Sequence, residues 1–326
     1  MAQVYRPEHP RPIFQRKAWL NLNGEWHFAL GSAKERSPPQ SWDGLINVPF
    51  CLQAELSGAL NQLTQQQLRD AGLHGPPLAP GLRRNQALWY RLELPVLPRA
   101  WHCMRILLHI GACDSFAQIS VNGMSFREHA GGSTAITLDI TEALLQSVDG
   151  PDELLIRCVD QPENGSMMPC GKQVCKSAFR GPGPHMPTLY SNVTGIWQTV
   201  WMEAVAAQAH LEQVQVVPVR HLVRDCEGVS WSLELFPQLA GGAEADTLLF
   251  EVNLFLNSSC KGKPLLCGEV LVCGRQPKLC LDLPPMIVRP WTPEDPHLYG
   301  LLLQLRLPSS RLLLDEVKSY TALRTV

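Results

Sequence analysis

The residues of this sequence with the greatest intrinsic reactivity are its eleven cysteines. A structural zinc site usually carries a C-x2-C pair together with a second pair of cysteines or histidines. No such pair occurs among the most closely spaced cysteines, which are Cys170, Cys175, Cys260, Cys267, Cys273 and Cys280. A nucleophilic cysteine would need a neighbouring base and an electropositive pocket, and the sequence indicates neither. We therefore predict no metal site and no cofactor.

Other catalytic patterns are also missing from the sequence. The stretch Gly131-Gly-Ser133-Thr-Ala lacks the closing glycine of a G-x-S-x-G nucleophile turn. No H-E-x-x-H zinc motif occurs, and no glycine-rich phosphate-binding loop. The sequence thus predicts no catalytic residue within these 326 positions.

Length, composition and net charge restrict the kind of protein and the partners that it can bind. A length of 326 residues predicts two domains, and 45% hydrophobic with 18% charged residues is typical of a globular protein. A formal net charge of -2 offers no basic surface for nucleic acid or anionic lipid. The first 17 residues lack an apolar core of signal-peptide type, and no run reaches the ~18 apolar residues of a membrane span. We expect a cytoplasmic protein without a membrane partner, with its cysteines as buried thiols.

The first two hundred residues are dominated by strand patterns. Alternating or apolar runs predict strands over residues 89–94, 104–110, 116–121, 153–159 and 196–205. Asn122-Gly123 follows the third of these runs and favours a tight hairpin turn. Leucine spacing predicts a helix over residues 60–71, and two further helical turns are predicted from Asp139. Gly/Pro-rich stretches predict loops over residues 51–87, apart from that helix, and 161–187.

The strand pattern restarts near residue 205. Seven short runs follow, over residues 211–219, 229–236, 247–256, 269–273, 278–283, 298–307 and 312–320. Many short strands separated by turns are typical of an immunoglobulin-like sandwich, although the Cys…Trp…Cys pattern of antibody domains is absent. The chain is therefore predicted to be all-β, with domains at 1–205 and 206–326.

Several motifs, taken in order, resemble family 2 glycoside hydrolases of the β-galactosidase and β-glucuronidase type. The motifs are Trp19-Leu-Asn-Leu-Asn-Gly-Glu-Trp-His-Phe, Asn47-Val-Pro-Phe, Leu88-Trp-Tyr-Arg, the stretch 109–123, Cys170-Gly-Lys-Gln, Val193-Thr-Gly-Ile-Trp-Gln-Thr-Val-Trp-Met-Glu, Pro290-Trp-Thr-Pro-Glu-Asp-Pro-His-Leu-Tyr and Asp315-Glu-Val-Lys-Ser-Tyr-Thr-Ala-Leu-Arg. Ala322 stands where the family usually has glycine. The resemblance implies a galactose-binding-like, sugar-binding jelly roll followed by an immunoglobulin-like sandwich.

The same resemblance implies a retaining enzyme whose two catalytic glutamates lie in a separate (β/α)8 barrel. In the family the acid/base belongs to an Asn-Glu pair, and this sequence contains no Asn-Glu dipeptide. The family's barrel would begin where this sequence ends, at Val326. We therefore expect a non-catalytic front portion, inactive alone, whose protein partner is a catalytic barrel or a second copy of the chain.

Family members use the loop before the Gly195-Ile-Trp strand to reach the sugar. Within this region Asp160, Lys172 and Gln173 are the predicted substrate-binding residues, with Glu163 and His185 nearby. A carboxylate and an amide suit sugar hydroxyls, and Lys172 would suit an acidic sugar such as a glucuronide. The alternative is a solvated loop whose polar groups bond their own backbone.

The aromatic residues Trp89, Tyr190, Trp197 and Trp201 could stack on a sugar ring, but packing is the favoured interpretation. On a continuous strand Trp197, Thr199 and Trp201 share one face, and the opposite face is also apolar, so both faces are expected to be covered. Two alternatives to the enzyme front stay open. One is a stand-alone carbohydrate-binding module, and the other is a protein-interaction scaffold that binds no sugar.

Overall fold

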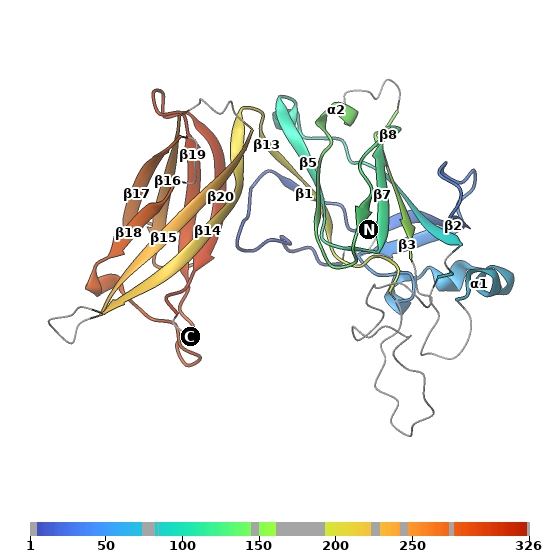
Figure 1. The fold of residues 1–326 in the computed structure, drawn as a ribbon, viewed down its shortest axis with the longest axis horizontal. Helices are drawn as coiled ribbons and strands as arrows, with labels where there is room; N and C mark the ends of the chain where they lie inside the picture. The colour runs from blue at the N-terminus through green and yellow to red at the C-terminus, as the bar shows by residue number, and fades with distance from the viewer. Residues whose placement is uncertain are drawn as a thin grey trace. The chain divides into compact units, whose positions relative to one another are not determined.

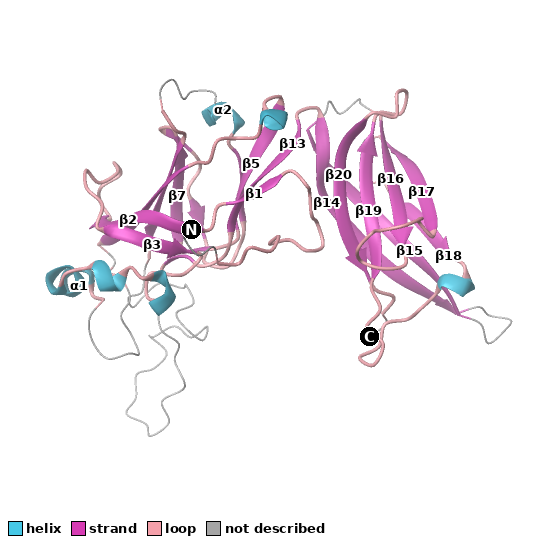
Figure 2. Cartoon of the chain, turned by 180° about the vertical axis from the view of Figure 1, so that it is seen from behind, coloured by secondary structure: helices cyan, strands magenta, loops and turns pink. Residues whose placement is uncertain are grey.

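The computed structural model describes residues 5–73, 82–83, 85–144, 150–160, 193–222, 229–241, 247–273 and 277–324. Strands form most of the regular structure in these ranges, and the helices are short (Figures 1 and 2). The predicted all-β sandwich class is confirmed.

Contacts between residues divide the chain into two compact units. The first unit contains Met1–Pro10, Leu20–His102 and Ile106–Glu203. The second contains Arg11–Trp19, Cys103–Arg105 and Ala204–Val326. A segment near the start of the sequence, Arg11–Trp19, therefore belongs to the second unit together with residues after position 203.

The strands up to Ala206 are β1 (Trp19–Asn21), β2 (Gly24–Ser32), β3 (Gly44–Val48), β4 (Gln86–Glu93), β5 (Met104–Ile110), β6 (Cys113–Asp114), β7 (Phe116–Val121), β8 (Met124–Ser125), β9 (His129–Ala130), β10 (Ile136–Asp139), β11 (Glu153–Val159), β12 (Gly195–Ile196) and β13 (Val200–Ala206). One sheet has the order β1-β13-β5-β10, and the larger has the order β3-β2-β4-β11-β7-β8 with β9 on β7. β12 and β6 form a separate pair.

In the larger sheet β4 and β11 bury consecutive residues, whereas β7 alternates buried and half-buried ones. β11 lies between β4 and β7, antiparallel to both, so that Ile156 is opposite Tyr90 and Ile119. Residues directly opposite one another on paired strands point to the same face of the sheet, and all three of these side chains are fully buried. The hairpin predicted at Asn122-Gly123 is confirmed, since both residues have positive φ and β8 pairs back on β7.

The helix predicted over residues 60–71 is shorter in the structure. A single 3-10 turn, Leu60–Gln62, precedes α1 (Gln65–Ala71). Thr64 caps α1 with a capping box, in which its hydroxyl accepts from the Gln67 backbone N–H. The turns predicted from Asp139 form α2 (Thr141–Leu144), and further 3-10 turns lie at Glu55–Ser57, Arg99–Trp101 and Pro285–Ile287.

The strands predicted beyond residue 205 are all confirmed. They are β14 (Ala209–Leu222), β15 (Val229–Gly241), β16 (Leu248–Phe255), β17 (Leu266–Val272), β18 (Leu279–Leu283), β19 (Tyr299–Arg306) and β20 (Leu313–Thr321). They form two sheets, β14-β15-β18 and β17-β16-β19-β20 (Figure 1). The inward residues of both sheets, among them Leu233, Phe250 and Leu303, make one hydrophobic core.

The segment Arg11–Trp19, here called the N-terminal strap, completes the second unit. Phe14 lies in the hydrophobic core, and Gln15 exchanges backbone hydrogen bonds with Lys318 of β20. The Arg16 guanidinium is buried and donates to both carboxylate oxygens of Asp315, at 3.0 and 2.9 Å. The strap thus adds core, backbone and ionic contacts to the last strand of the chain.

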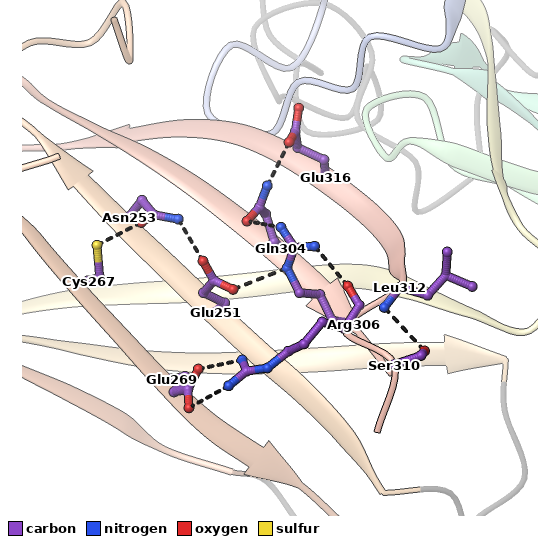
Figure 3. Close-up of polar contacts among 10 residues, drawn as sticks. Glu251, Asn253, Cys267, Glu269, Gln304, Arg306, Ser310, Leu312 and Glu316 are labelled. Atoms are coloured by element: carbon purple, nitrogen blue, oxygen red, sulfur yellow. Dashed lines mark hydrogen bonds and ion pairs between the residues drawn. The ribbon is translucent and has the colours of Figure 1, made fainter. Parts of the chain in front are cut away.

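The outer face of the sheet β17-β16-β19-β20 carries a polar network (Figure 3). Arg306 donates to Glu251 and to Gln304, and Gln304 in turn donates to Glu316 at 2.7 Å. Glu269, on β17, is held by the guanidinium of Arg311. The Arg311–Glu269 pair is exposed and contributes little to stability, whereas Arg306 and Glu251 are half-buried and Gln304 is buried.

Candidate functional site

Asp160 is the predicted binding residue that the structure describes, and it lies directly after β11. Asp160 is 8% exposed to solvent. The Thr194 hydroxyl donates to Asp160 Oδ2 at 2.9 Å. Lys172 and Gln173 lie outside the described residues, as do Glu163, His185 and Tyr190. The geometry of the site therefore rests on Asp160 and its described neighbours in the first unit.

A second carboxylate, Asp114, lies beside Asp160 and was not found by sequence reasoning. Burial, and then the charge of Asp160, raises the pKa of Asp114 to about 6, while the Ser115 hydroxyl works in the opposite direction. Within the described part of the chain, no cationic side chain forms an ion pair with Asp114. Placing two carboxylates side by side in a half-buried position costs stability, and groups with pKa values perturbed in this way cluster at functional sites, so we take this pair as the candidate site.

The backbone around Asp114 is fixed by short strands. β6 pairs with β12, which places Asp114 opposite Gly195 and Cys113 opposite Ile196. The Tyr90 hydroxyl accepts from the Ile196 N–H at 3.1 Å. Gly195 has φ +91°, and a Cβ there would collide with the Tyr90 hydroxyl. The turn into β12 therefore requires glycine, and it sets the position of Thr194.

A glycine also lies against the Asp114 carboxylate. A Cβ on Gly132 would be 2.6 Å from Asp114 Oδ2, so the loop backbone packs directly on the carboxyl group. The carbonyl of Gly132 accepts from the indole N–H of Trp197 at 2.7 Å. This hydrogen bond fixes the Trp197 indole against the same loop.

Trp197 corrects one sequence interpretation. The strand predicted over residues 196–205 is interrupted, because β12 ends at Ile196 and β13 begins at Val200. Between them the N–H of Trp197 bonds to Ala112 and the carbonyl of Thr199 bonds to Gly111. The prediction of a shared face for Trp197 and Trp201 is therefore wrong: Trp197 is 38% exposed and Trp201 is buried.

Trp89 and Trp201 are core residues, as the packing interpretation predicted. The Trp201 ring stacks on His109 with centroids 4.8 Å apart. Trp197, by contrast, is exposed and bonded to the Gly132 loop that packs on Asp114.

The described cysteines are free thiols, but the expectation that they are buried is wrong for several of them. Cys113 and Cys158 are buried, whereas Cys103, Cys267, Cys273 and Cys280 are exposed on strand ends and edges. A hydrogen bond with the Cys113 thiol, and then burial, raises the pKa of Cys158. Cys158 donates its S–H to the Asp114 carbonyl at 2.7 Å, so it acts as a structural thiol rather than a nucleophile.

In the described ranges, no three His, Cys, Asp or Glu side chains are arranged to hold a metal ion. Within those ranges, too, no helix is long and apolar enough to cross a membrane. The chemistry that the site offers is that of oxygen acceptors: Asp160 and Asp114 accept hydrogen bonds, and Asp114 can also donate when it is protonated near pH 6.

Comparison with solved structures places the fold among bacterial β-glucuronidases. The chain is similar to Bacteroides uniformis β-glucuronidase 2, covalently bound to cyclophellitol-6-carboxylate aziridine, with 22% identity over 94% of this chain and a TM-score of 0.60. It is also similar to the Ruminococcus gnavus β-glucuronidase in complex with D-glucuronic acid, with 17% identity over 95% of this chain and a TM-score of 0.62. The all-β sandwich fold expected from the sequence resemblance is confirmed.

The likeness covers 32% of the B. uniformis chain and 47% of the R. gnavus chain. This chain thus spans about a third to a half of the enzymes whose fold it shares. No protein-family model and no curated protein matches the sequence.

Proposed function

We propose that this chain recognises a terminal β-glycoside, as the non-catalytic portion of a family 2 glycoside hydrolase. In this proposal Asp160 accepts hydrogen bonds from sugar hydroxyls and Asp114 lines the same pocket wall. The observation that carries the proposal is the orientation of Asp160 by Thr194 beside a second, half-buried carboxylate.

The neighbouring groups suit a sugar. Carboxylate oxygens accept hydroxyl hydrogen bonds strongly, since one partner is charged. The exposed ring of Trp197 offers a flat apolar surface for the C–H face of a pyranose. Lys172 and Gln173 complete the proposed site from the sequence, and the ammonium of Lys172 would favour a glucuronide over a galactoside.

The similarity to β-glucuronidases supports the enzyme class, and the missing Asn-Glu pair supports an inactive chain. We assign the first unit to a sugar-binding jelly roll and the second to an immunoglobulin-like sandwich. Their role is to hold a catalytic barrel and to shape the sugar pocket. The free described thiols support a reducing cytoplasm.

The test is calorimetric titration of the purified chain with D-glucuronic acid and with D-galactose, beside a turnover assay with the nitrophenyl β-glycosides of both sugars. We expect saturable binding without turnover. Asp160→Asn should weaken binding by about tenfold or more, because a hydrogen bond to a charged acceptor is lost. Asp70→Asn, on the exposed face of α1, is the matched control and should bind like the wild type.

Each other outcome points to a different class of protein. Turnover by the chain alone would contradict the non-catalytic assignment. Absence of binding to both sugars would favour a scaffold that contacts only protein. Binding that is indifferent to Asp160→Asn would place the sugar elsewhere on the chain, as in a stand-alone carbohydrate-binding module.

A further inference from the structure

A hydrogen-bonded chain of side chains leads from Gln53 to the candidate site. The Gln53 amide nitrogen donates to Thr194 Oγ1 at 2.9 Å, and the Thr194 backbone N–H donates back to Gln53 Oε1 at 3.0 Å. The Thr194 hydroxyl then donates to Asp160 Oδ2 at 2.9 Å. Three segments distant in sequence are thereby joined within the first unit.

The donor and acceptor of each of these hydrogen bonds follow from the hydrogens that each group carries. Because the Thr194 backbone N–H must donate to an oxygen, Gln53 is fixed with Oε1 toward the backbone and its NH2 group toward the hydroxyl. The Thr194 hydroxyl oxygen thus accepts a hydrogen bond from Gln53, and it donates its own hydrogen to Asp160. Gln53 therefore decides which way the Thr194 hydroxyl donates.

Backbone contacts hold the hydrogen-bonded side chains of Gln53 and Thr194 in place. The Leu52 N–H donates to the Thr194 carbonyl at 3.0 Å, next to the side-chain contacts of Gln53. Thr194 is fully buried and precedes Gly195, which has a positive φ and packs against the Tyr90 hydroxyl. Neither the Thr194 nor the Gln53 side chain can rotate away without breaking a hydrogen bond to its neighbour.

We infer that Gln53 and Thr194 are positioning residues for Asp160, which hold its carboxylate in the orientation that receives a sugar hydroxyl. This inference rests on the proposed function of Asp160. A carboxylate that is already oriented loses less conformational freedom on binding, so the sugar gains affinity without a direct contact to Gln53.

The experiment uses the full chain with Thr194→Val, Gln53→Ala and the conservative Thr194→Ser, titrated calorimetrically with D-glucuronic acid and D-galactose. Thr194→Val removes the hydrogen bond to the Asp160 carboxylate, and Gln53→Ala removes the bond that fixes the Thr194 hydroxyl. Each should weaken binding by about tenfold. Thr194→Ser keeps the hydroxyl and should restore affinity. Gln53→Ala leaves Thr194 unchanged, so it still tests the inference if Thr194→Val does not fold.

Gln62→Ala is the matched control for the loss of a glutamine amide. The Gln62 side chain also makes reciprocal bonds, with the backbone N–H and carbonyl of Leu45 on β3, but it has no contact with Asp160. Its removal should leave sugar affinity unchanged, so that a general loss of stability is separated from loss of positioning.

A second readout needs no ligand. Titration of the Asp160 carboxyl by NMR should show a higher pKa in Thr194→Val than in the wild type or Thr194→Ser, because a donor to the ionised form is missing. An unchanged titration in Thr194→Val would overturn the inference. If the wild-type chain binds neither sugar, the proposed function fails and the titration alone decides whether Thr194 orients the carboxylate.

Discussion

At the scale of single residues, the charge of Asp160 acts on the pKa of its neighbour Asp114. Burial is the largest cause of the raised pKa of Asp114, and the charge on Asp160 is the second. The second cause can be removed without emptying the site, because asparagine has nearly the shape of aspartate.

We predict that Asp160→Asn lowers the pKa of Asp114 from about 6 toward the ordinary range of an aspartate. NMR titration of the side-chain carboxyls measures it directly. Asp70→Asn, in α1, should leave the Asp114 titration unchanged. An Asp114 pKa that stays near 6 in Asp160→Asn would mean that burial alone raises it.

The same raised pKa predicts how stability depends on pH. The folded chain keeps a proton on Asp114 up to about pH 6, whereas an unfolded aspartate loses it near pH 4. Between these values the folded state binds more protons, so the contribution of Asp114 to stability falls as pH rises. Above pH 6 the ionised, half-buried carboxylate is a net penalty.

Asp114→Asn should therefore stabilise the first unit at pH 7 by about 1 kcal/mol, after allowance for partial solvent screening. Near pH 3 the substitution should have little effect, because the carboxyl is protonated in both states. Urea unfolding at the two pH values tests this. Equal effects at both would assign the change to packing rather than to charge.

At the scale of elements, the turn into β12 depends on one glycine. Gly195→Ala introduces a Cβ at φ +91° that meets the Tyr90 hydroxyl, and it should destabilise the first unit by about 3 kcal/mol or more. Gly123→Ala is the control: its φ is also positive, but nothing lies within 4 Å of the new Cβ, and about 1 kcal/mol is expected. Similar losses in thermal unfolding would show that φ, not Tyr90, makes Gly195 necessary.

Alternation along the sequence was sufficient to predict most of the strands. It failed over residues 197–199, where the chain passes from β12 to β13 and Trp197 turns outward. The interruption depends on Gly111, since Gln198 packs where a Cβ of residue 111 would be, and no local pattern near Trp197 reports that contact. Strand pairing between distant segments decides such breaks, and hydrophobic period alone does not.

The candidate site could likewise be predicted only in part from the sequence. Asp160 could be proposed from its place after a strand and from the family resemblance. Asp114 could not, because its signal is burial beside Asp160, which lies 46 positions further on in the sequence. The contribution of Gln53 was equally hidden, since its role depends on Thr194 and the two are 141 residues apart.

At the scale of the whole molecule, residues near the start of the chain complete the unit formed by its end. The Arg16 guanidinium and Asp315 are separated by 299 positions, yet they form a buried, two-pronged ion pair. Asp315 also accepts the Leu211 N–H and the Glu316 N–H, each at 2.9 Å. One carboxylate thus joins the N-terminal strap, β14 and β20.

We predict that Arg16→Ala destabilises the second unit by about 3–5 kcal/mol, because it leaves Asp315 buried without its cationic partner. Hydrogen exchange of the core amides of β16 and β19 measures the loss within that unit. Lys17→Ala is the neighbouring control. Lys17 pairs with Glu316 from an exposed position, so its removal should change stability by less than about 1 kcal/mol. If both variants exchange like the wild type, the buried ion pair adds nothing to the stability of the second unit. If only Arg16→Ala exchanges faster, the N-terminal strap stabilises that unit through Asp315.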